Sequence, residues 1–308
     1  MNRISATVAG VASGPALDLV IQAPRLSPAA AAAFRNAVGH RCCERRNGAM
    51  RLRGVDIAAA STIEELALRW RCDAALVSAG LRLNSFRVLA LDMDSTLIRD
   101  ECIDQIARRA GQGTEVAAIT AAAMRGEITD YAESLRRRVA LLAGADAGIV
   151  QWARRYRLRL SPGAARLVRV ARHSGLHTML VTGGFGVMAR RLQERLRIDT
   201  IAANELGISR GRLTGTVSGP AGDPTTIVDA QGKALALQQV CARLGCSTAH
   251  AIAIGDGAND LPMLQLAGLS VAFHAKPKVR GLAMQRLDYC GLDGVLPWFD
   301  QAAGPAPS

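Results

Sequence analysis

The chain has 308 residues, 49% of them hydrophobic and 4% aromatic, and a formal net charge of +12 at pH 7. Its length suffices for one large domain and a small one, and no apolar run approaches the ~20 residues that a membrane-spanning helix needs. The basic residues are scattered, without an aromatic-interleaved basic motif, so the charge does not indicate a nucleic-acid surface. We therefore expect no nucleic-acid partner and no membrane partner, and, because no leader-like N-terminal segment is evident, a cytoplasmic protein.

Residues 1–84 are expected to form a small N-terminal α/β domain. Its predicted elements are two strands, Asp18–Gln22 and Ala49–Val55, and two helices, Ser27–Val38 and Thr62–Arg71. Ser27 is followed by proline, a typical helix start, and Ser61 stands three residues before Glu64, the spacing of a capping box. The remaining residues, 85–308, are expected to form the larger domain.

The segment Val88–Leu97 joins an apolar strand directly to two carboxylates, Asp92 and Asp94. A short apolar run before a polar break is typical of a buried parallel strand, and ligands of such sheets bind beyond the carboxyl ends of the strands. Two aspartates two residues apart point the same way and repel each other unless a proton or a cation such as magnesium joins them. The pair suits a nucleophile beside a proton-transferring carboxylate, although alone it is also compatible with a turn or a helix cap.

Residues 100–158 are expected to be almost wholly helical, with breaks at Gly126 and Gly144. A helical insertion after the first strand of the large domain predicts a cap that closes over the carboxylates. Helix and strand then alternate from Ser161 through Val271, which predicts a parallel sheet. The expected fold class is therefore α/β: a doubly wound parallel sheet with a helical cap insertion and a small N-terminal α/β domain.

Three later segments add polar groups where a strand ends or a helix begins. They are a strand that ends in a hydroxyl and two glycines (Thr182, Gly183 and Gly184), a lysine at a helix start (Lys233), and a strand that ends in acidic and amide side chains (Asp256, Asn259 and Asp260). Singly, the glycines could form an ordinary turn and the lysine could be a solvated surface residue. However, a compact ammonium binds a phosphate as a point charge, and Lys233 is one of only three lysines.

In their order along the chain, these features resemble the four motifs of the haloacid-dehalogenase superfamily of phosphotransferases. Within it, the segments Asp92–Asp104, Met124–Glu127 and Glu133–Val139 resemble the phosphoserine phosphatase family. The resemblance covers residues 86–296. Residues 1–80 resemble, more loosely, the small regulatory ligand-binding domain of longer family members.

The resemblance implies a magnesium-dependent phosphatase that hydrolyses L-phosphoserine to L-serine and phosphate through an aspartyl-phosphate. Asp92 would be the nucleophile, Asp94 the proton donor and acceptor, and Lys233 the catalytic cation. Asp92, Asp256 and the backbone carbonyl of Asp94 would bind Mg²⁺. Asp260 would hold the metal-bound waters from behind.

For substrate recognition, the resemblance implies Glu101 for the ammonium and Arg138 for the carboxylate. It implies Thr182 and the amides of Gly183 and Gly184 for the phosphate, and Asn259 for the phosphate or another part of the substrate. A bidentate guanidinium suits a carboxylate, but spacing alone would make Arg138 a surface arginine of an arginine-rich helix. Met124 and Tyr131 are implied as an apolar wall of the pocket. The segment before Tyr131 is one residue longer than the family spacing, which puts that residue in doubt.

Two alternatives stay open from the sequence. One is a related small-molecule phosphatase or phosphotransferase of the same superfamily. The other is a non-catalytic binding or regulatory protein, which the complete set of Asp92, Asp94, Lys233 and Asp256 disfavours. The expected partner is a small-molecule substrate, and a homodimer is compatible with the sequence.

Overall fold

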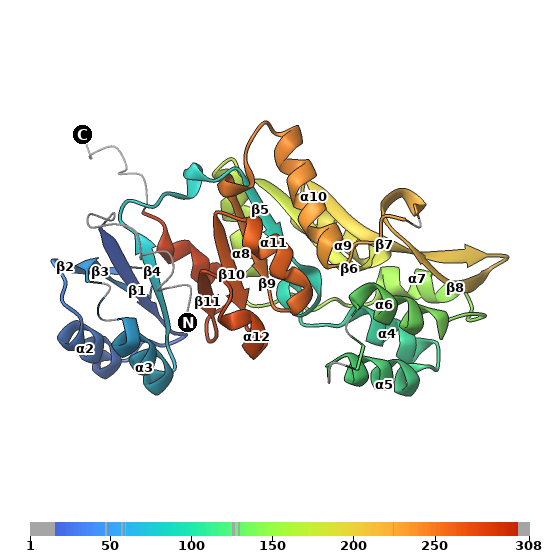
Figure 1. Cartoon of the computed structure of the whole chain (residues 1–308), viewed down its shortest axis with the longest axis horizontal. Helices are drawn as coiled ribbons and strands as arrows, with labels where there is room; N and C mark the ends of the chain where they lie inside the picture. Colours follow the sequence, from blue (N-terminus) through green and yellow to red (C-terminus); the bar gives the residue numbers. More distant parts are fainter. Residues whose placement is uncertain are drawn as a thin grey trace.

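The computed structural model describes residues 16–300 except 47, 57, 59, 125, 126, 129 and 224. Within these residues the chain forms two sheets, one of four strands and one of seven. Figure 1 shows the four-stranded sheet at one end of the molecule, the seven-stranded sheet in the middle, and a group of helices at the other end. None of the helices in the described ranges combines the length and apolarity that crossing a bilayer requires.

The N-terminal sheet belongs to a βαββαβ unit. Its elements are β1 (Leu17–Gln22), α2 (Pro28–Ala37), β2 (Cys42–Arg46), β3 (Ala49–Val55), α3 (Ala60–Trp70) and β4 (Asp73–Ser78). The strand order is β2-β3-β1-β4 and each neighbouring pair is antiparallel, which is a ferredoxin-like arrangement. The two strands predicted from the sequence are β1 and β3. The prediction missed β2 and β4.

The helix starts of this unit agree with the sequence in one case and differ in the other. Ser27 caps α2, because its Oγ accepts a hydrogen bond from the backbone N–H of Ala30 at 3.1 Å. Helix α3 already begins at Ala60, so Ser61 lies inside the helix and the predicted capping box is wrong.

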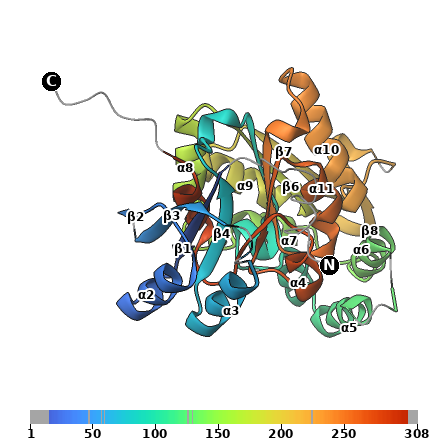
Figure 2. The same ribbon diagram turned by 60° about the vertical axis from the view of Figure 1, so that its left-hand side comes forward.

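The two faces of the N-terminal sheet pack against different partners. Leu19 and Ile21 of β1 point to a core that they share with α2 and α3, and these helices lie along the same face in both views (Figures 1 and 2). Val20, between them, points to the opposite face and shares a core with Val295 and Trp298 near the end of the described chain. Because successive side chains of β1 point to opposite faces, one face of the sheet packs against α2 and α3 and the other against the C-terminal part of the chain.

The seven-stranded sheet has the order β11-β10-β9-β5-β6-β7-β8. Its strands are β5 (Val88–Leu91), β6 (His177–Phe185), β7 (Thr200–Ser209), β8 (Arg212–Ser218), β9 (Ala251–Gly255), β10 (Leu269–Phe273) and β11 (Gln285–Leu287). Strands β11 to β7 pair in parallel, and β8 joins β7 as an antiparallel edge. The C-terminal ends of β5, β6 and β9, neighbours in the centre, therefore meet at one edge of the sheet.

Helices cover both faces of this sheet, as the doubly wound prediction requires. They are α8 (Ala164–His173), α9 (Gly186–Leu196), α10 (Ala230–Arg243), α11 (Leu261–Leu266) and α12 (Pro277–Arg280). Leu89 and Leu91 of β5 are buried in the core with residues of α8 and α9. Val88 and Ala90 are buried in the core with residues of α10 and α11. The central strand is thus apolar on both faces, which explains its continuous hydrophobic run.

The insertion between β5 and α8 is helical, as predicted. It contains α4 (Cys102–Arg109), α5 (Gly113–Met124), α6 (Tyr131–Ala140) and α7 (Gly148–Arg155). The two chain segments that enter and leave the insertion meet at an antiparallel bridge between Ile98 and Leu160. There the buried carboxylate of Asp100 accepts hydrogen bonds from the backbone N–H and the guanidinium of Arg159. This joint fixes the base of the insertion.

Candidate active site

The site is built around Asp92, which directly follows β5. Asp92 is only 4% exposed, and its backbone N–H donates a hydrogen bond to the carbonyl of Ile254 on the neighbouring strand β9 at 3.0 Å. The chain then turns sharply, with Ser95 in the left-handed region at φ +56°. This turn brings Asp94 beside the start of α4, where its Oδ1 accepts a hydrogen bond from the N–H of Cys102 at 3.2 Å. A rigid strand end therefore carries both carboxylates.

Lys233 reaches Asp92 from the first turn of α10. Asp229 caps this helix by accepting a hydrogen bond from the N–H of Gly232 at 2.8 Å, which fixes the turn that bears the lysine. The Lys233 side chain is fully buried, with Nζ 2.5 Å from Oδ1 of Asp92 and 2.6 Å from Oδ1 of Asp260. A solvated surface lysine is thus excluded.

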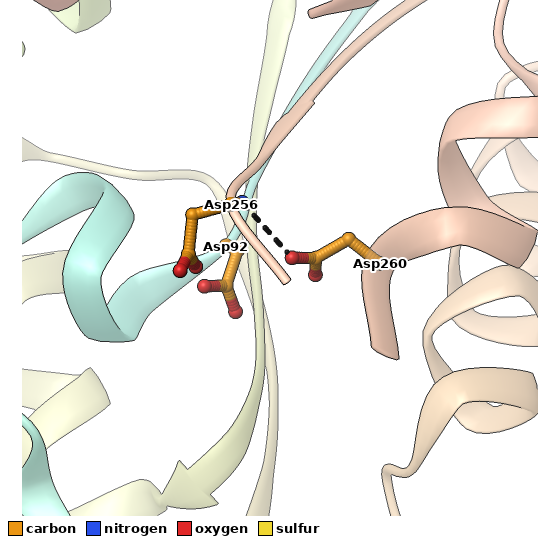
Figure 3. A group of neighbouring side chains, drawn as sticks. All are labelled: Asp92, Asp256 and Asp260. Atoms are coloured by element: carbon orange, nitrogen blue, oxygen red, sulfur yellow. Dashed lines mark hydrogen bonds between the residues drawn. The ribbon is translucent and has the colours of Figure 1, made fainter. Parts of the chain in front are cut away.

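Three carboxylates crowd at this edge of the sheet (Figure 3). Oxygens of Asp92, Asp256 and Asp260 all lie within 4.8 Å of one another. The second Asp260 oxygen accepts hydrogen bonds from the N–H groups of Asp256 and Gly257, at 3.1 and 2.9 Å. Because Lys233 and two backbone amides occupy its oxygens, Asp260 holds the loop in place. The carboxylates of Asp92 and Asp256 accept fewer hydrogen bonds from the protein than that of Asp260.

The charges in the site do not balance without a cation. Burial and the carboxylates of Asp260 and Asp256 raise the pKa of Asp92 well above its ordinary value, against the opposing effect of Lys233. Burial and Asp260 likewise raise the pKa of Asp256 to about 6. Hard oxygen donors with unbalanced negative charge are the setting that Mg²⁺ prefers. The residues therefore fit a divalent cation held by Asp92 and Asp256.

Asp94 is not part of this cluster through its side chain. It lies instead toward the helical insertion, where burial and the nearby Glu101 raise its pKa to about 7. A carboxyl group of this pKa can both donate and accept a proton near neutrality.

The phosphate-binding segment predicted at Thr182–Gly184 forms the end of β6. The buried Thr182 hydroxyl accepts a hydrogen bond from the N–H of Gly184 at 2.8 Å. A β carbon on Gly184 would lie 2.9 Å from Oδ2 of Asp94, so only glycine allows this approach to the carboxylate. The structure thus brings the segment next to Asp94.

Asn204 supports this segment, and the sequence analysis missed it. Its side chain, fully buried on β7, donates hydrogen bonds to the carbonyls of Gly183 and Val228 at 3.0 and 3.3 Å. Its oxygen accepts one from the N–H of Val228 at 2.8 Å. Asn204 therefore ties the glycine segment to the chain that leads into α10. An amide directly after the apolar residues Ile201–Ala203 of β7 is the signal that could have identified it.

The helical insertion brings both predicted recognition residues toward the site. Glu101, at the N-terminal end of α4, accepts a hydrogen bond from Ser95 Oγ at 2.7 Å. Arg138 on α6 is only 9% exposed, and its Nε donates to the carbonyl of Ser134 at 3.2 Å. No carboxylate among the described residues pairs with Arg138. It is therefore a buried cation without a counter-ion, not a surface arginine.

The remaining three residues that were predicted to contact the substrate are Tyr131, Met124 and Asn259. Tyr131 lies against Gly183, since a β carbon there would be 2.0 Å from the tyrosine Oη; the extra residue before it does not remove it from the site. The side chain of Met124 lies outside the described part of the structure. Asn259 is half-buried beside Gly257, with its Oδ1 2.4 Å from the position of a β carbon there.

Comparison with known proteins connects this arrangement to a family. The family model of haloacid dehalogenase-like hydrolases matches residues 89–265. The phosphoserine phosphatase of Polaromonas sp. is 52% identical over 217 residues, which cover 70% of this chain and 91% of that protein. That of Albidiferax ferrireducens is 51% identical over 220 residues, 71% of this chain and 92% of that protein.

Solved structures extend the similarity to the N-terminal unit. A probable phosphoserine phosphatase from Vibrio cholerae has a TM-score of 0.77 at 34% identity and covers 94% of this chain and 88% of its own. A had family hydrolase from Salmonella enterica serovar Typhi has a TM-score of 0.79 at 30% identity and covers 91% of this chain and 97% of its own. Coverage above nine-tenths means that part of the βαββαβ unit has a counterpart in both.

Proposed function

The chain belongs to the haloacid dehalogenase-like hydrolase family, and we propose that within this family it hydrolyses L-phosphoserine to L-serine and phosphate. The observation that carries the proposal is the fully buried Lys233, hydrogen-bonded to Asp92 just after β5, together with the buried Arg138 of the helical insertion, which pairs with no carboxylate among the described residues. The first pair suits a phosphoryl group and the arginine suits a carboxylate. Relatives named phosphoserine phosphatase, up to 52% identical, support the same substrate.

The reaction proceeds in two steps on Asp92. Its carboxylate attacks phosphorus in line, forming an aspartyl-phosphate, while the ester oxygen leaves as the serine hydroxyl with a proton from Asp94. A water molecule then attacks the phosphorus, Asp94 takes its proton, and Asp92 is released with inorganic phosphate. The pKa of about 7 suits Asp94 to both transfers.

Asp92, Asp256 and the backbone carbonyl of Asp94 would hold Mg²⁺. The bound ion neutralises charge on the carboxylates and on the phosphoryl oxygens. Burial alone would lower the pKa of Lys233, but Asp260 and Asp92 raise it above its ordinary value. The ammonium therefore stays charged and binds a phosphoryl oxygen beside Asp92. Thr182 and the amides of Gly183 and Gly184 supply the other phosphate contacts, with Asn259 at the rim.

The insertion supplies the specificity. Arg138 pairs with the substrate carboxylate, and Glu101 pairs with its ammonium. Both side chains lie on the insertion, so closure over a substrate that carries both groups is favoured over closure on a phosphate ester that lacks one.

We further propose two domains, residues 1–84 and 85–308, with the helical cap at about 100–158, and a cytoplasmic location. The boundary would fall in the turn Leu83–Ser85, between β4 and β5. The separate core of the N-terminal helices supports the division. The position of the first domain away from the cap (Figure 1) is compatible with a regulatory role.

The test is turnover of a panel of small phosphate esters with Mg²⁺ by the purified protein. Phosphoserine should be hydrolysed with the highest kcat/KM, ahead of phosphoethanolamine, phosphoglycolate and p-nitrophenyl phosphate. Better turnover of another ester would show a different phosphatase of the family. Transfer of phosphate to an added alcohol in preference to water would show a phosphotransferase.

A further inference from the structure

Tyr131 is the residue of the helical insertion that lies against the phosphate-binding segment. It is the first residue of α6, whose N-cap, Asp130, accepts a hydrogen bond from the N–H of Ala132 at 2.8 Å. A β carbon on Gly183 would lie 2.0 Å from Tyr131 Oη and 2.7 Å from its Cζ. The phenol therefore occupies the space that a side chain at position 183 would take, and its hydroxyl end reaches the loop.

This hydroxyl has a proton to donate and no acceptor among the described residues. Burial, together with the charges of Asp94 and Asp92, raises the pKa of Tyr131 to about 12, against the opposing effects of Lys233 and Arg138. The phenol thus stays protonated in an environment that contains both the proposed nucleophile and the phosphate-binding lysine. Tyr131 is half-buried and its hydroxyl lies against Gly183, so the hydroxyl can donate a hydrogen bond to a ligand oxygen at this loop.

Arg138 lies two helical turns after Tyr131, on the same face of α6. Its guanidinium carbon is 6.0 Å from the centre of the Tyr131 ring. One face of α6 therefore carries a donor at the phosphate end of the site and a cation beside it. A donor and a cation side by side suit a small ester that carries a phosphate and a carboxylate.

We propose that the Tyr131 hydroxyl donates a hydrogen bond to a phosphoryl oxygen bound at Thr182–Gly184, so that the cap contacts the phosphate as well as the amino-acid part of the substrate. This proposal rests on the proposed phosphatase function. It assigns Tyr131 a polar role in place of the apolar wall expected from the sequence. Because the contact joins the cap to the core, it forms only when the cap is closed.

The test uses Tyr131→Phe, which removes the hydroxyl and keeps the ring against Gly183. The KM values for phosphoserine and phosphoethanolamine should both rise by roughly tenfold, the loss expected for one hydrogen bond to a charged group. The Kd of inorganic phosphate, measured by calorimetry on the Mg²⁺-loaded protein, should rise by a similar factor. Tyr289→Phe, which removes a hydroxyl near the N-terminal unit, should leave all three values unchanged.

Arg138→Ala separates this contact from carboxylate recognition, because it should weaken phosphoserine and spare phosphoethanolamine and inorganic phosphate. Values for Tyr131→Phe within twofold of the parent for all three ligands would show that the ring only packs. If the parent does not bind inorganic phosphate measurably, the KM values for the two esters alone decide between the hydrogen bond and packing. A parent that binds phosphate but prefers another ester would overturn the serine assignment, and the phosphate Kd would still decide the role of Tyr131.

Discussion

Two of the buried aspartates, Asp73 and Asp92, are surrounded in opposite ways. Asp73, at the start of β4, is 3% exposed and accepts hydrogen bonds from the backbone N–H groups of Asp288, Tyr289 and Cys290, at 2.6 to 3.3 Å. Asp92, at the end of β5, is 4% exposed and lies among like charges, where it shares Lys233 with Asp260.

The electrostatics follow from this difference. At Asp73, burial raises the pKa, and the surrounding N–H groups oppose the rise. At Asp92, burial and two neighbouring carboxylates all raise the pKa, and Lys233 opposes them. The first carboxylate has its hydrogen bonds satisfied by backbone of the sheet-edge loop after β11, so it anchors the N-terminal unit. The second lies among like charges that Lys233 only partly offsets, which is the setting in which we propose that a cation and a phosphoryl group bind.

The same substitution at both places should have very different effects. In Asp92→Asn, the attacking charge is lost while the shape is kept, so kcat should fall on the order of a thousandfold or more. Asp73→Asn should leave kcat within a few-fold of the parent. Steady-state assays with phosphoserine measure both. Near-normal hydrolysis by Asp92→Asn would rule out the aspartyl-phosphate mechanism.

Removal of divalent ions should impair the cluster of Asp92, Asp256 and Asp260 and leave the surroundings of Asp73 unchanged. Excess chelator should lower activity by at least about a hundredfold, and Mg²⁺ should restore it, because the clustered carboxylates need a cation. Ca²⁺ should substitute poorly, since it is larger and accepts more ligands. Added Mg²⁺ should also raise the Tm, and this rise should be absent in Asp256→Asn. Undiminished activity in chelator would refute the metal assignment.

Arg138 extends the comparison to a buried cation that pairs with no carboxylate among the described residues. Arg138→Ala should reduce the preference for phosphoserine over phosphoethanolamine by roughly ten- to a hundredfold, because one charge-assisted contact of about 1.5–3 kcal/mol is lost. Arg137→Ala is the control, because Arg137 is exposed and paired with Glu133. Comparison of kcat/KM for the two esters measures the effect. Unchanged discrimination in Arg138→Ala would remove the main support for the serine assignment.

The anchoring role of Asp73 predicts the smallest effect, one on stability. Asp73→Ala leaves buried N–H groups without an acceptor and should lower the free energy of unfolding by about 2–3 kcal/mol. Glu64→Ala removes a more exposed acid that pairs with Arg286 across the same junction, and should cost about 0–1 kcal/mol. Urea denaturation measures both. Equal losses would mean that burial does not distinguish the two acids.

Much of the site could be predicted because strand ends can be recognised locally. The apolar runs before Asp92, Thr182 and Asp256 predict buried strands, and parallel strands bring their carboxyl ends to one edge. The helical insertion and the two-sided sheet follow from periodicity in the same way. Strand β2 (Cys42–Arg46) was missed because it is an edge strand whose residues 42–45 are exposed, without an apolar face.

The sequence by itself determined which residue types stand at the strand ends and that helices cover both faces of the sheet, since both depend on neighbours in the chain. Only the tertiary structure decided which of these residues meet. The sharing of Lys233 between Asp92 and Asp260, the bracing of Gly183 by Asn204, and the contact of Tyr131 with Gly183 each join segments more than 20 residues apart. Such contacts depend on the packing of whole elements, which local spacing does not encode.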